Sequence, residues 1–181
     1  MITEQQLILI KPDESYAKEI SSYRKEMLDA NSSMDGCGSL RSQSDPQKWI
    51  QDNHLFENKE TLPVKDWVAA SQYVCVRTTD HKIVGMIQVR HYFNDYLEKY
   101  AGHIGYSVRP SERRKGYAKW MLHAILPVCR DLELDRILIT CLKDNEGSRK
   151  TILANNGVYE NTIFEPDEKV FLERYWINLI P

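Results

Sequence analysis

Apolar and polar residues alternate along the chain with two different periods. The apolar run at 6–11 predicts a short strand, and helical spacing of apolar residues after Asp13 predicts an amphipathic helix. A second short helix is predicted to start at Asp45-Pro46, because Asp caps helices well and Pro suits the first helical position. The Gly- and Ser-rich segment 31–47 is predicted to be a long irregular loop, a kind of segment that is often functional.

From Trp67 onward the pattern is that of strands. The β-rich runs 72–77 and 83–91 are separated by a polar turn and predict a hairpin. Pro110 ends the next strand because it has no amide hydrogen to donate. The later strands are predicted at 102–109, 136–142, 158–164 and 170–177, the last two forming a second hairpin.

The centre of the predicted fold is a βαβ unit. Helical spacing predicts a helix over 116–131, between the strand 102–109 and the nearly unbroken apolar run 136–142, which is typical of a strand buried on both faces. Such a unit is right-handed. A further helix over 145–155 stops at Asn156-Gly157, where Gly can close a helix. The predicted fold class is therefore α/β, with helices and strands mixed in the α+β manner.

Length and composition narrow the protein class. The 181 residues and 21.2 kDa fit one domain over 1–181. A net charge of −2 and a pI near 6.2 give no field that would attract polyanions, so we expect no nucleic-acid partner. No apolar stretch reaches the roughly 20 residues that a bilayer requires, so we expect no membrane partner.

The N-terminus and the cysteines indicate a cytoplasmic protein. The first residues, MITEQQLILIKPDE, lack the pattern of a secretory signal. The four cysteines form no C-x-x-C pair, which fits reduced, mostly buried thiols better than disulfides or a zinc site. We therefore predict no metal site.

The segment VRPSERRKGYA, residues 108–118, is a candidate anion site. It joins a strand to a helix, where several amide hydrogens have no partner inside the helix. Gly116 lets the backbone approach a ligand, and Arg113, Arg114 and Lys115 add positive charge beside the positive end of the helix. A solvated basic turn explains the same residues. The phosphate loops G-x-G-x-x-G and G-x-x-x-x-G-K-[ST] are both missing.

The residues Arg113, Gly116 and Ala118 form R-x-x-G-x-A, which resembles the acyl-CoA pyrophosphate signature of the GNAT superfamily of N-acetyltransferases. The predicted order of elements is similar to that of the superfamily over almost the whole chain. The stretches RHYFND (90–95), GHIGYSVRPSERRKGYA (102–118), DNEGSRKTI and RYWI more narrowly resemble a bacterial subgroup of predicted acetyltransferases, and this resemblance names no acceptor.

The resemblance implies a GNAT-like acyltransferase fold with a mostly antiparallel central sheet, in which the parallel strands 102–109 and 136–142 splay apart. It implies acetyl-CoA (coenzyme A) as acyl donor, with its pantetheine arm between the two strands. Backbone amides around Tyr106 to Val108 would hold the arm and the acetyl carbonyl, and a backbone donor there suits an oxyanion. The cofactor-binding residues implied are Ser107, Val108, Arg113, Arg114, Lys115, Gly116, Tyr117, Ala118, Asn145 and Ser148.

Transfer to an amine also needs a base and an acid. His103 is the first candidate base, because it lies on the strand that would hold the cofactor and titrates near neutral pH, although a strand histidine is more often only packed. His91 is the second, with Asn94 and Asp95 as acceptor contacts, whereas Glu98 suits a solvated turn equally well.

Several groups are candidates for the acid. Many relatives carry a tyrosine where this chain has Leu153, four residues before the glycine that ends the helix. Tyr106, Tyr159 or a water could replace it, although each tyrosine also fits an ordinary packed aromatic.

The expected function is direct acetyl transfer from acetyl-CoA to a primary amine of a small molecule or polypeptide, without a covalent enzyme intermediate. Two alternatives remain open. Leu153 is compatible with a protein that only binds or senses acyl-CoA, and the basic loop is compatible with a nucleotide-binding regulatory domain. The C-terminal hairpin could pair two subunits in a homodimer, although edge strands are also commonly shielded by charge.

Overall fold

The computed structural model describes residues 6–180. The helices and strands lie in the order β1 (Leu7–Ile10), α1 (Ala17–Asp29), α2 (Pro46–Phe56), β2 (Ala70–Arg77), β3 (Lys82–Arg90), β4 (Ile104–Val108), α3 (Tyr117–Asp131), β5 (Arg136–Leu142), α4 (Glu146–Leu153), β6 (Val158–Glu165) and β7 (Val170–Asn178). This order agrees with the one predicted, and most bounds differ by a few residues at most. Short 3₁₀ turns occur at Glu14–Tyr16, Gly38–Arg41, Lys59–Thr61 and Pro110–Glu112, and a π-helical turn at Leu97–Ala101.

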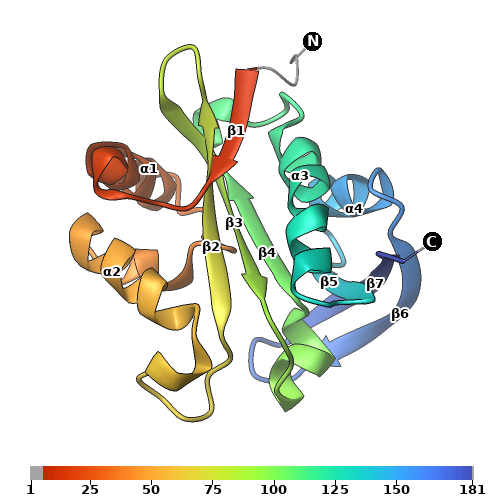
Figure 1. The fold of residues 1–181 in the computed structure, drawn as a ribbon. Coiled ribbons are helices and arrows are strands. Elements are labelled where there is room, and N and C mark those ends of the chain that lie inside the picture. Colours follow the sequence, from red (N-terminus) through yellow and green to blue (C-terminus); the bar gives the residue numbers. More distant parts are fainter. Residues whose placement is uncertain (1–5, 181) are drawn as a thin grey trace.

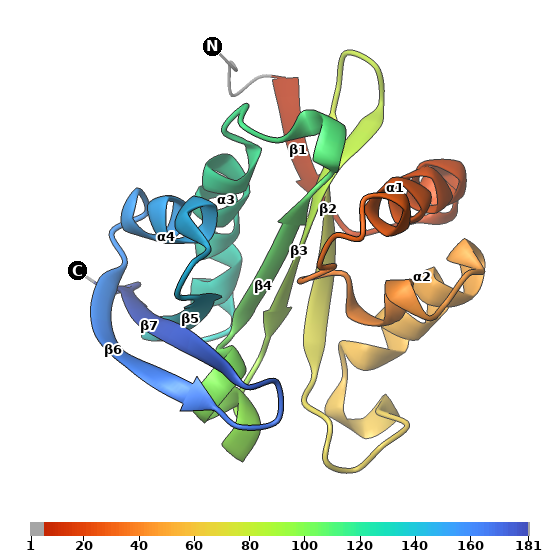
Figure 2. The same cartoon turned by 180° about the vertical axis from the view of Figure 1, so that it is seen from behind.

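The strands form two sheets. Four strands pair in the order β1-β2-β3-β4, and three pair in the order β5-β7-β6, with every ladder antiparallel. Helices α1 and α2 lie on one face of the first sheet, and α3 lies on the other with α4 beside it (Figures 1 and 2). The fold class is mixed α/β, as predicted.

Of the two predicted helix caps, Asp45 caps α2, whereas Asp13 caps the 3₁₀ turn Glu14–Tyr16 that leads into α1. The Asp13 side chain accepts a hydrogen bond from the backbone N–H of Ser15, and the helical segment begins at the next residue. Asp45 accepts hydrogen bonds from the N–H groups of Gln47 and Lys48, with Pro46 in the first turn. Each carboxylate satisfies amides that have no partner within the helix.

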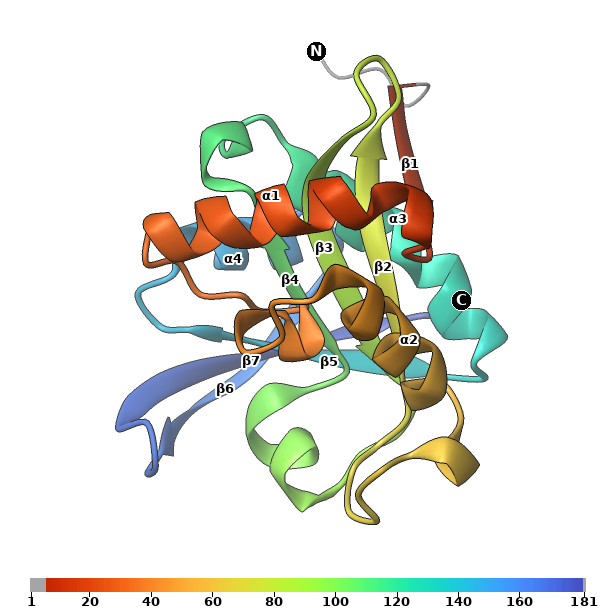
Figure 3. The same ribbon diagram turned by 90° about the vertical axis from the view of Figure 1, so that its left-hand side faces the viewer.

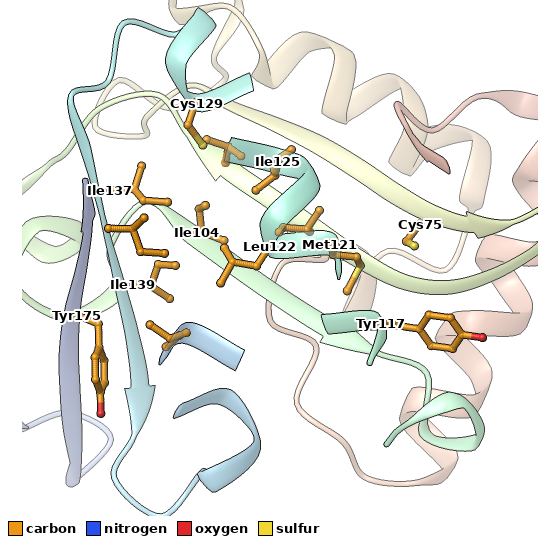
Figure 4. Packing of buried hydrophobic residues seen from close by; sticks show 14 of the residues in the cluster. Cys75, Ile104, Tyr117, Met121, Leu122, Ile125, Cys129, Ile137, Ile139 and Tyr175 are labelled. Carbon is orange, nitrogen blue, oxygen red and sulfur yellow. The ribbon is translucent and has the colours of Figure 1, made fainter. Parts of the chain in front are cut away.

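Two apolar clusters hold the helices against the first sheet. On the α3 side, Met121, Leu122 and Ile125 are fully buried against residues of β4 and β5 (Figure 4). On the α1 and α2 side, Tyr23 and Trp49 are also fully buried. Both faces of the strands next to the predicted site are therefore covered.

The strands β4 and β5 meet at one end only. An isolated bridge joins Gly102 to Ile139, and the backbone N–H of His103 donates to the carbonyl of Leu138 at 2.8 Å. In return, the N–H of Leu138 donates to Nδ1 of His103 at 3.0 Å. No ladder joins β4 to β5 beyond this point among the described residues, so the strands diverge and form a fork.

The fork modifies the expected sheet. A central sheet with two splayed strands was predicted, and the described residues instead form two sheets that touch at the bridge. The imidazole of His103 explains the break, because it takes the amide hydrogen that a backbone carbonyl would accept in a continuing ladder. Strand β4 is also shorter than the predicted 102–109.

Within residues 6–180, no helix combines the length and the apolar character needed to cross a membrane.

Leu122→Ala should lower the free energy of unfolding by about 2–5 kcal/mol, because the side chain is fully buried and its loss leaves a cavity. Leu153→Ala removes the same group from a residue that is 49% exposed and should change stability by about 0.5 kcal/mol or less. Urea titration followed by circular dichroism compares the two. Equal losses for both variants would contradict the proposed core.

Candidate active site

The loop between β4 and α3 has the geometry of an anion site. Gly116 precedes the first residue of α3 and has a φ of 87°, in the left-handed region that favours glycine. The N–H groups of the first turn of α3 have no partner within the helix, and the positive end of the helix dipole adds to them. Gly116 is exposed, so an anion can reach this turn. These features fit a diphosphate.

A buried carboxylate fixes one side of this loop. The side chain of Glu112 is 5% exposed and accepts hydrogen bonds from Arg77 (2.9 Å), Lys82 (2.9 Å) and Lys115 (2.7 Å). Burial alone would raise the pKa of Glu112, but these three cations lower it well below its usual range. Arg77 also donates to the hydroxyl of Tyr117 at 2.9 Å. The hairpin β2–β3 is thereby tied to the loop and to the start of α3.

Helix α1 fixes the other side of the loop. Arg109 is 3% exposed and donates to Glu19 at 3.2 Å, with Glu26 at 3.8 Å. Glu26 in turn accepts the backbone N–H of Ser111 at 2.7 Å. The loop therefore has carboxylate contacts on both sides, which hold its backbone in place.

The three predicted phosphate-binding cations differ in availability. Lys115 donates a hydrogen bond to the carboxylate of Glu112. Arg113 donates to the carbonyl of Val108 at 3.2 Å and to the hydroxyl of Ser32. Arg114 has a φ of 65° and is exposed, and within residues 6–180 its side chain makes no hydrogen bond or ion pair. Arg114 is therefore the most available of the three for a ligand.

Two predicted residues meet across the fork. The hydroxyl of Tyr106 on β4 lies 2.8 Å from Oγ of Ser148 on α4. Asn145 Oδ1 accepts the N–H of Ser148 at 3.0 Å, which makes Asn145 the cap of α4. Burial chiefly raises the pKa of Tyr106, so the phenol stays protonated at neutral pH.

Ser107 points to the other face of β4. Its Oγ lies 3.1 Å from the hydroxyl of Tyr23 and 3.1 Å from Sγ of Cys37, and all three residues are buried. Burial raises the pKa of the Cys37 thiol to about 12, so this sulfur stays protonated. Ser107 can therefore offer a ligand on the α4 side only its backbone.

The geometry argues against His103 as a general base. Its Nδ1 accepts the N–H of Leu138, so in the neutral ring Nε2 carries the proton and no lone pair is free. Burial, with a smaller contribution from Arg90, lowers the pKa of His103 to about 4. The ring also packs on Phe93, with centroids 3.9 Å apart. His103 instead closes the fork.

His91 lies on the opposite face of the sheet from His103. The N–H of Arg90 donates to the carbonyl of His103, so these two residues are cross-strand neighbours that share a face, and the next residue points the other way. Nε2 of His91 lies 2.8 Å from Oγ of Ser71, and burial lowers its pKa. The structure thus does not bring the two predicted histidines together.

The other candidates are spread over the second sheet and the loop beside it. Tyr159 bonds to Thr162 at 2.8 Å on β6, the strand of its sheet furthest from β5, and is 52% exposed. Asn94 bonds to the N–H of Leu97 at 2.9 Å. Asp95 and Glu98 line an open groove of about 410 Å³ together with residues of β6 and β7. Leu153 is exposed on α4.

Sequence reasoning missed Glu112, Arg90 and Asp35. Glu112 lies inside the motif that was read for its cations, and Asp35 lies in the loop 31–47 beside Gly36, a glycine with a φ of 72°. The pair Asp35-Gly36 was the available signal, because a glycine in a loop often marks a close approach of two backbones. Among residues 6–180, no cluster of three or more His, Cys, Asp or Glu side chains could hold a metal ion.

Comparison with known proteins identifies the fold. A family model described as an acetyltransferase (GNAT) domain matches residues 6–157. The ribosomal-protein-S5-alanine acetyltransferase of Vibrio fischeri has a TM-score of 0.72 at 18% identity, with 98% of this chain and 95% of that chain covered. The spermidine N-acetyltransferase of Vibrio cholerae, solved with CoA and spermine, has a TM-score of 0.66 at 14% identity, with 97% of both chains covered.

A putative acetyltransferase of Salmonella typhimurium, solved with its cofactor acetyl-CoA, has a TM-score of 0.65 at 9% identity, covering 96% of this chain and 94% of that one. No curated protein sequence matches the chain significantly.

Glu112→Gln should lower the free energy of unfolding at pH 7 by about 2–3 kcal/mol, because charge-assisted hydrogen bonds to buried groups are lost. The folded-state pKa of Glu112 lies below its unfolded value, so its contribution is complete above about pH 5 and declines as pH falls through and below about 4. The difference in free energy of unfolding between the wild type and Glu112→Gln should therefore shrink on acidification. Urea titrations at pH 7, 5 and 3 measure the difference.

Glu146→Gln is the matched control, because Glu146 pairs with Lys150 on an exposed helix surface. This variant should match the wild type at every pH. A difference between Glu112→Gln and wild type that does not change with pH would show that the charge of Glu112 is not what holds the loop.

Proposed function

The chain belongs to the GNAT acetyltransferase family, and on that premise we propose that it transfers the acetyl group of acetyl-CoA directly to a primary amine. The observation that carries this proposal is the left-handed turn at Gly116, which sets the free amides of α3 beside the open end of the β4–β5 fork. Acetyl-CoA supplies the thioester. The turn binds its diphosphate through backbone N–H groups and Arg114.

The fork positions the reacting end of the donor. Among the residues that the structure describes, the edge of β4 that faces β5 has no strand partner beyond the bridge at Gly102, so its backbone groups are available to the pantetheine arm. Ser148 and the start of α4 line the same opening from the β5 side. The N–H groups of β4 near Tyr106 then stabilise negative charge on the acetyl oxygen.

Tyr106 supplies the acid. Its protonated phenol, hydrogen-bonded to Ser148, returns a proton to the departing thiolate. The C–N bond forms as the C–S bond breaks. Of the three ammonium protons of the acceptor, one stays on the amide nitrogen, one restores Tyr106, and one passes to solvent. Leu153 therefore does not prevent turnover, since Tyr106 takes the role assigned to a tyrosine at that position.

The acceptor is a small-molecule amine or the amino group of a polypeptide. Structural relatives named for a ribosomal-protein alanine and for spermidine span this range. A cytoplasmic location accords with the four free, buried cysteines. A homodimer is proposed through β6, an edge strand on which Val158, Tyr159 and Phe164 are exposed.

Gly116→Ala should raise the Kd for coenzyme A about tenfold or more, because a Cβ at this left-handed position costs about 1–2 kcal/mol and crowds the diphosphate. Lys119→Ala, an exposed change in the next part of α3, should leave the Kd unaltered. Isothermal titration of coenzyme A and of ATP into both variants and wild type measures this.

A thiol-release assay with acetyl-CoA and a panel of amines completes the test. Tight coenzyme A binding without thiol release for any amine would identify an acyl-CoA-binding module. ATP binding more tightly than coenzyme A would identify a nucleotide-binding domain. Either result contradicts acetyl transfer.

Tyr106→Phe should lower kcat about 10²-fold with little change in the Kd for acetyl-CoA, because only proton donation to the thiolate is lost. Tyr159→Phe removes a hydroxyl from an exposed tyrosine on β6 and should retain full kcat. Steady-state kinetics of both variants with one amine give the comparison. An unchanged kcat in Tyr106→Phe would assign the acid to another group.

A further inference from the structure

The connection between α1 and α2 packs directly on β4 at the fork, on the face covered by those helices (Figure 3). A Cβ added to Gly36 would lie 2.1 Å from the carbonyl oxygen of Gly105, and one added to Gly105 would lie 2.8 Å from the N of Gly36. A Cβ at either position would clash with the backbone of the other, so this close contact of the two backbones requires glycine at both positions 36 and 105. Gln72 Nε2 also donates to the carbonyl of Gly36 at 2.8 Å. The backbone of Gly36 is therefore fixed against the strand that leads to Tyr106.

This contact places Asp35 beside the reacting region. Asp35 immediately precedes Gly36 and is exposed, and within residues 6–180 its carboxylate makes no hydrogen bond or ion pair. Its charge reaches the fork, since burial first and the charge of Asp35 in addition raise the pKa of Tyr106. A carboxylate at this position that has no partner among the described residues is available to bind a cation.

Arg90 flanks the same position from β3. Its Nη1 donates to the carbonyls of Gly102 (3.1 Å) and Ala101 (3.4 Å), and its Nη2 lies 3.7 Å from where a Cβ of Gly105 would be. The side chain is partly buried, and burial lowers its pKa, yet an arginine stays charged at neutral pH. No carboxylate of residues 6–180 lies within ion-pairing distance of it.

Asp35, next to Gly36, and Arg90 are thus opposite charges near Gly105 that form no ion pair with each other. Their charges interact, since Asp35 acts to raise the pKa of Arg90 against the larger effect of burial. A partly buried guanidinium without an anion is costly, and a ligand carboxylate would offset that cost. A ligand ammonium would do the same for Asp35.

We propose that Asp35 and Arg90 form an acceptor subsite for a free α-amino acid, in which Asp35 binds the ammonium group and Arg90 binds the carboxylate. The inference rests on the proposed acetyl transfer and adds the acceptor class. A polyamine offers no anion to Arg90, and the N-terminus of a polypeptide has an amide where an amino acid has its carboxylate. Asp35 then holds the amine toward the thioester.

The first experiment compares acceptors in the wild type. Each of the common α-amino acids and its methyl ester, spermidine, and an alanyl dipeptide are assayed for thiol release with acetyl-CoA. Binding of the same compounds to the protein saturated with coenzyme A is measured by calorimetry, which requires no turnover. At least one free amino acid should bind and react tenfold or more better than its ester. Equal use of acid and ester, or a preference for spermidine or the dipeptide, would overturn the subsite.

The second experiment tests the separate roles of Arg90 and Asp35. Its probes are the amino acid that reacts best in the wild type and the methyl ester of that amino acid. Arg90→Gln should raise KM for the free acid at least tenfold and abolish its preference over the ester, with a smaller effect on kcat, and Arg90→Lys should restore part of the preference. Asp35→Asn should lower kcat/KM for acid and ester alike. Asp131→Asn, an exposed change at the end of α3, should behave as wild type.

Coenzyme A affinity distinguishes a failure of the proposed acetyl transfer from a failure of the proposed acceptor subsite. All variants should bind coenzyme A as the wild type does, which also shows that they are folded. A wild type that binds no coenzyme A refutes the proposed function. A wild type that acetylates amines while Arg90→Gln keeps the preference for free acid over ester refutes only the subsite.

Discussion

The hydrogen bonds between His103 and Leu138 determine the shape of the site. A continuing ladder between β4 and β5 would leave no space for a cofactor arm, whereas two unconnected sheets would leave the strands without a fixed separation. The paired contacts, 2.8 Å from the His103 amide to the Leu138 carbonyl and 3.0 Å from the Leu138 amide to Nδ1, satisfy both polar groups of Leu138 at once. Because the imidazole replaces a backbone carbonyl, the ladder stops there and the strands diverge. The same contact removes the lone pair that catalysis would need.

Charge is used in the phosphate loop mainly to position the backbone. Glu112 and the pair Glu19 and Glu26 hold the loop between the hairpin β2–β3 and helix α1, and the cations they bind include Lys115 and Arg109. Without these carboxylates, the cationic side chains of the loop would repel one another and the loop would stay mobile. The carboxylates cancel part of the charge and leave the amides of α3, together with Arg114, available for the proposed diphosphate. The proposed site therefore depends on preorganised backbone more than on the number of basic side chains.

The sequence predicted the helices and strands, because these depend mainly on local signals. Asp45 caps α2 as expected, Asp13 caps the 3₁₀ turn that leads into α1, and Gly116 takes the left-handed conformation. The catalytic assignments needed information that is not local. The sequence gives no sign that Nδ1 of His103 meets an amide 35 residues away, or that Glu112 binds Arg77 from another hairpin. Asp35 lies near the strand β4 because Gly36 packs on Gly105, a contact between residues far apart in the sequence.

The alternation of side chains along β4 separates donor chemistry from acceptor chemistry. Tyr106 points toward α4 and the thiol side, whereas Gly105 and Ser107 face α1 and the connection that carries Asp35. A single strand thus presents the proposed acid to one face and the proposed acceptor subsite to the other. Substitutions on the α1 face can then change which amine is accepted while the binding of coenzyme A is preserved.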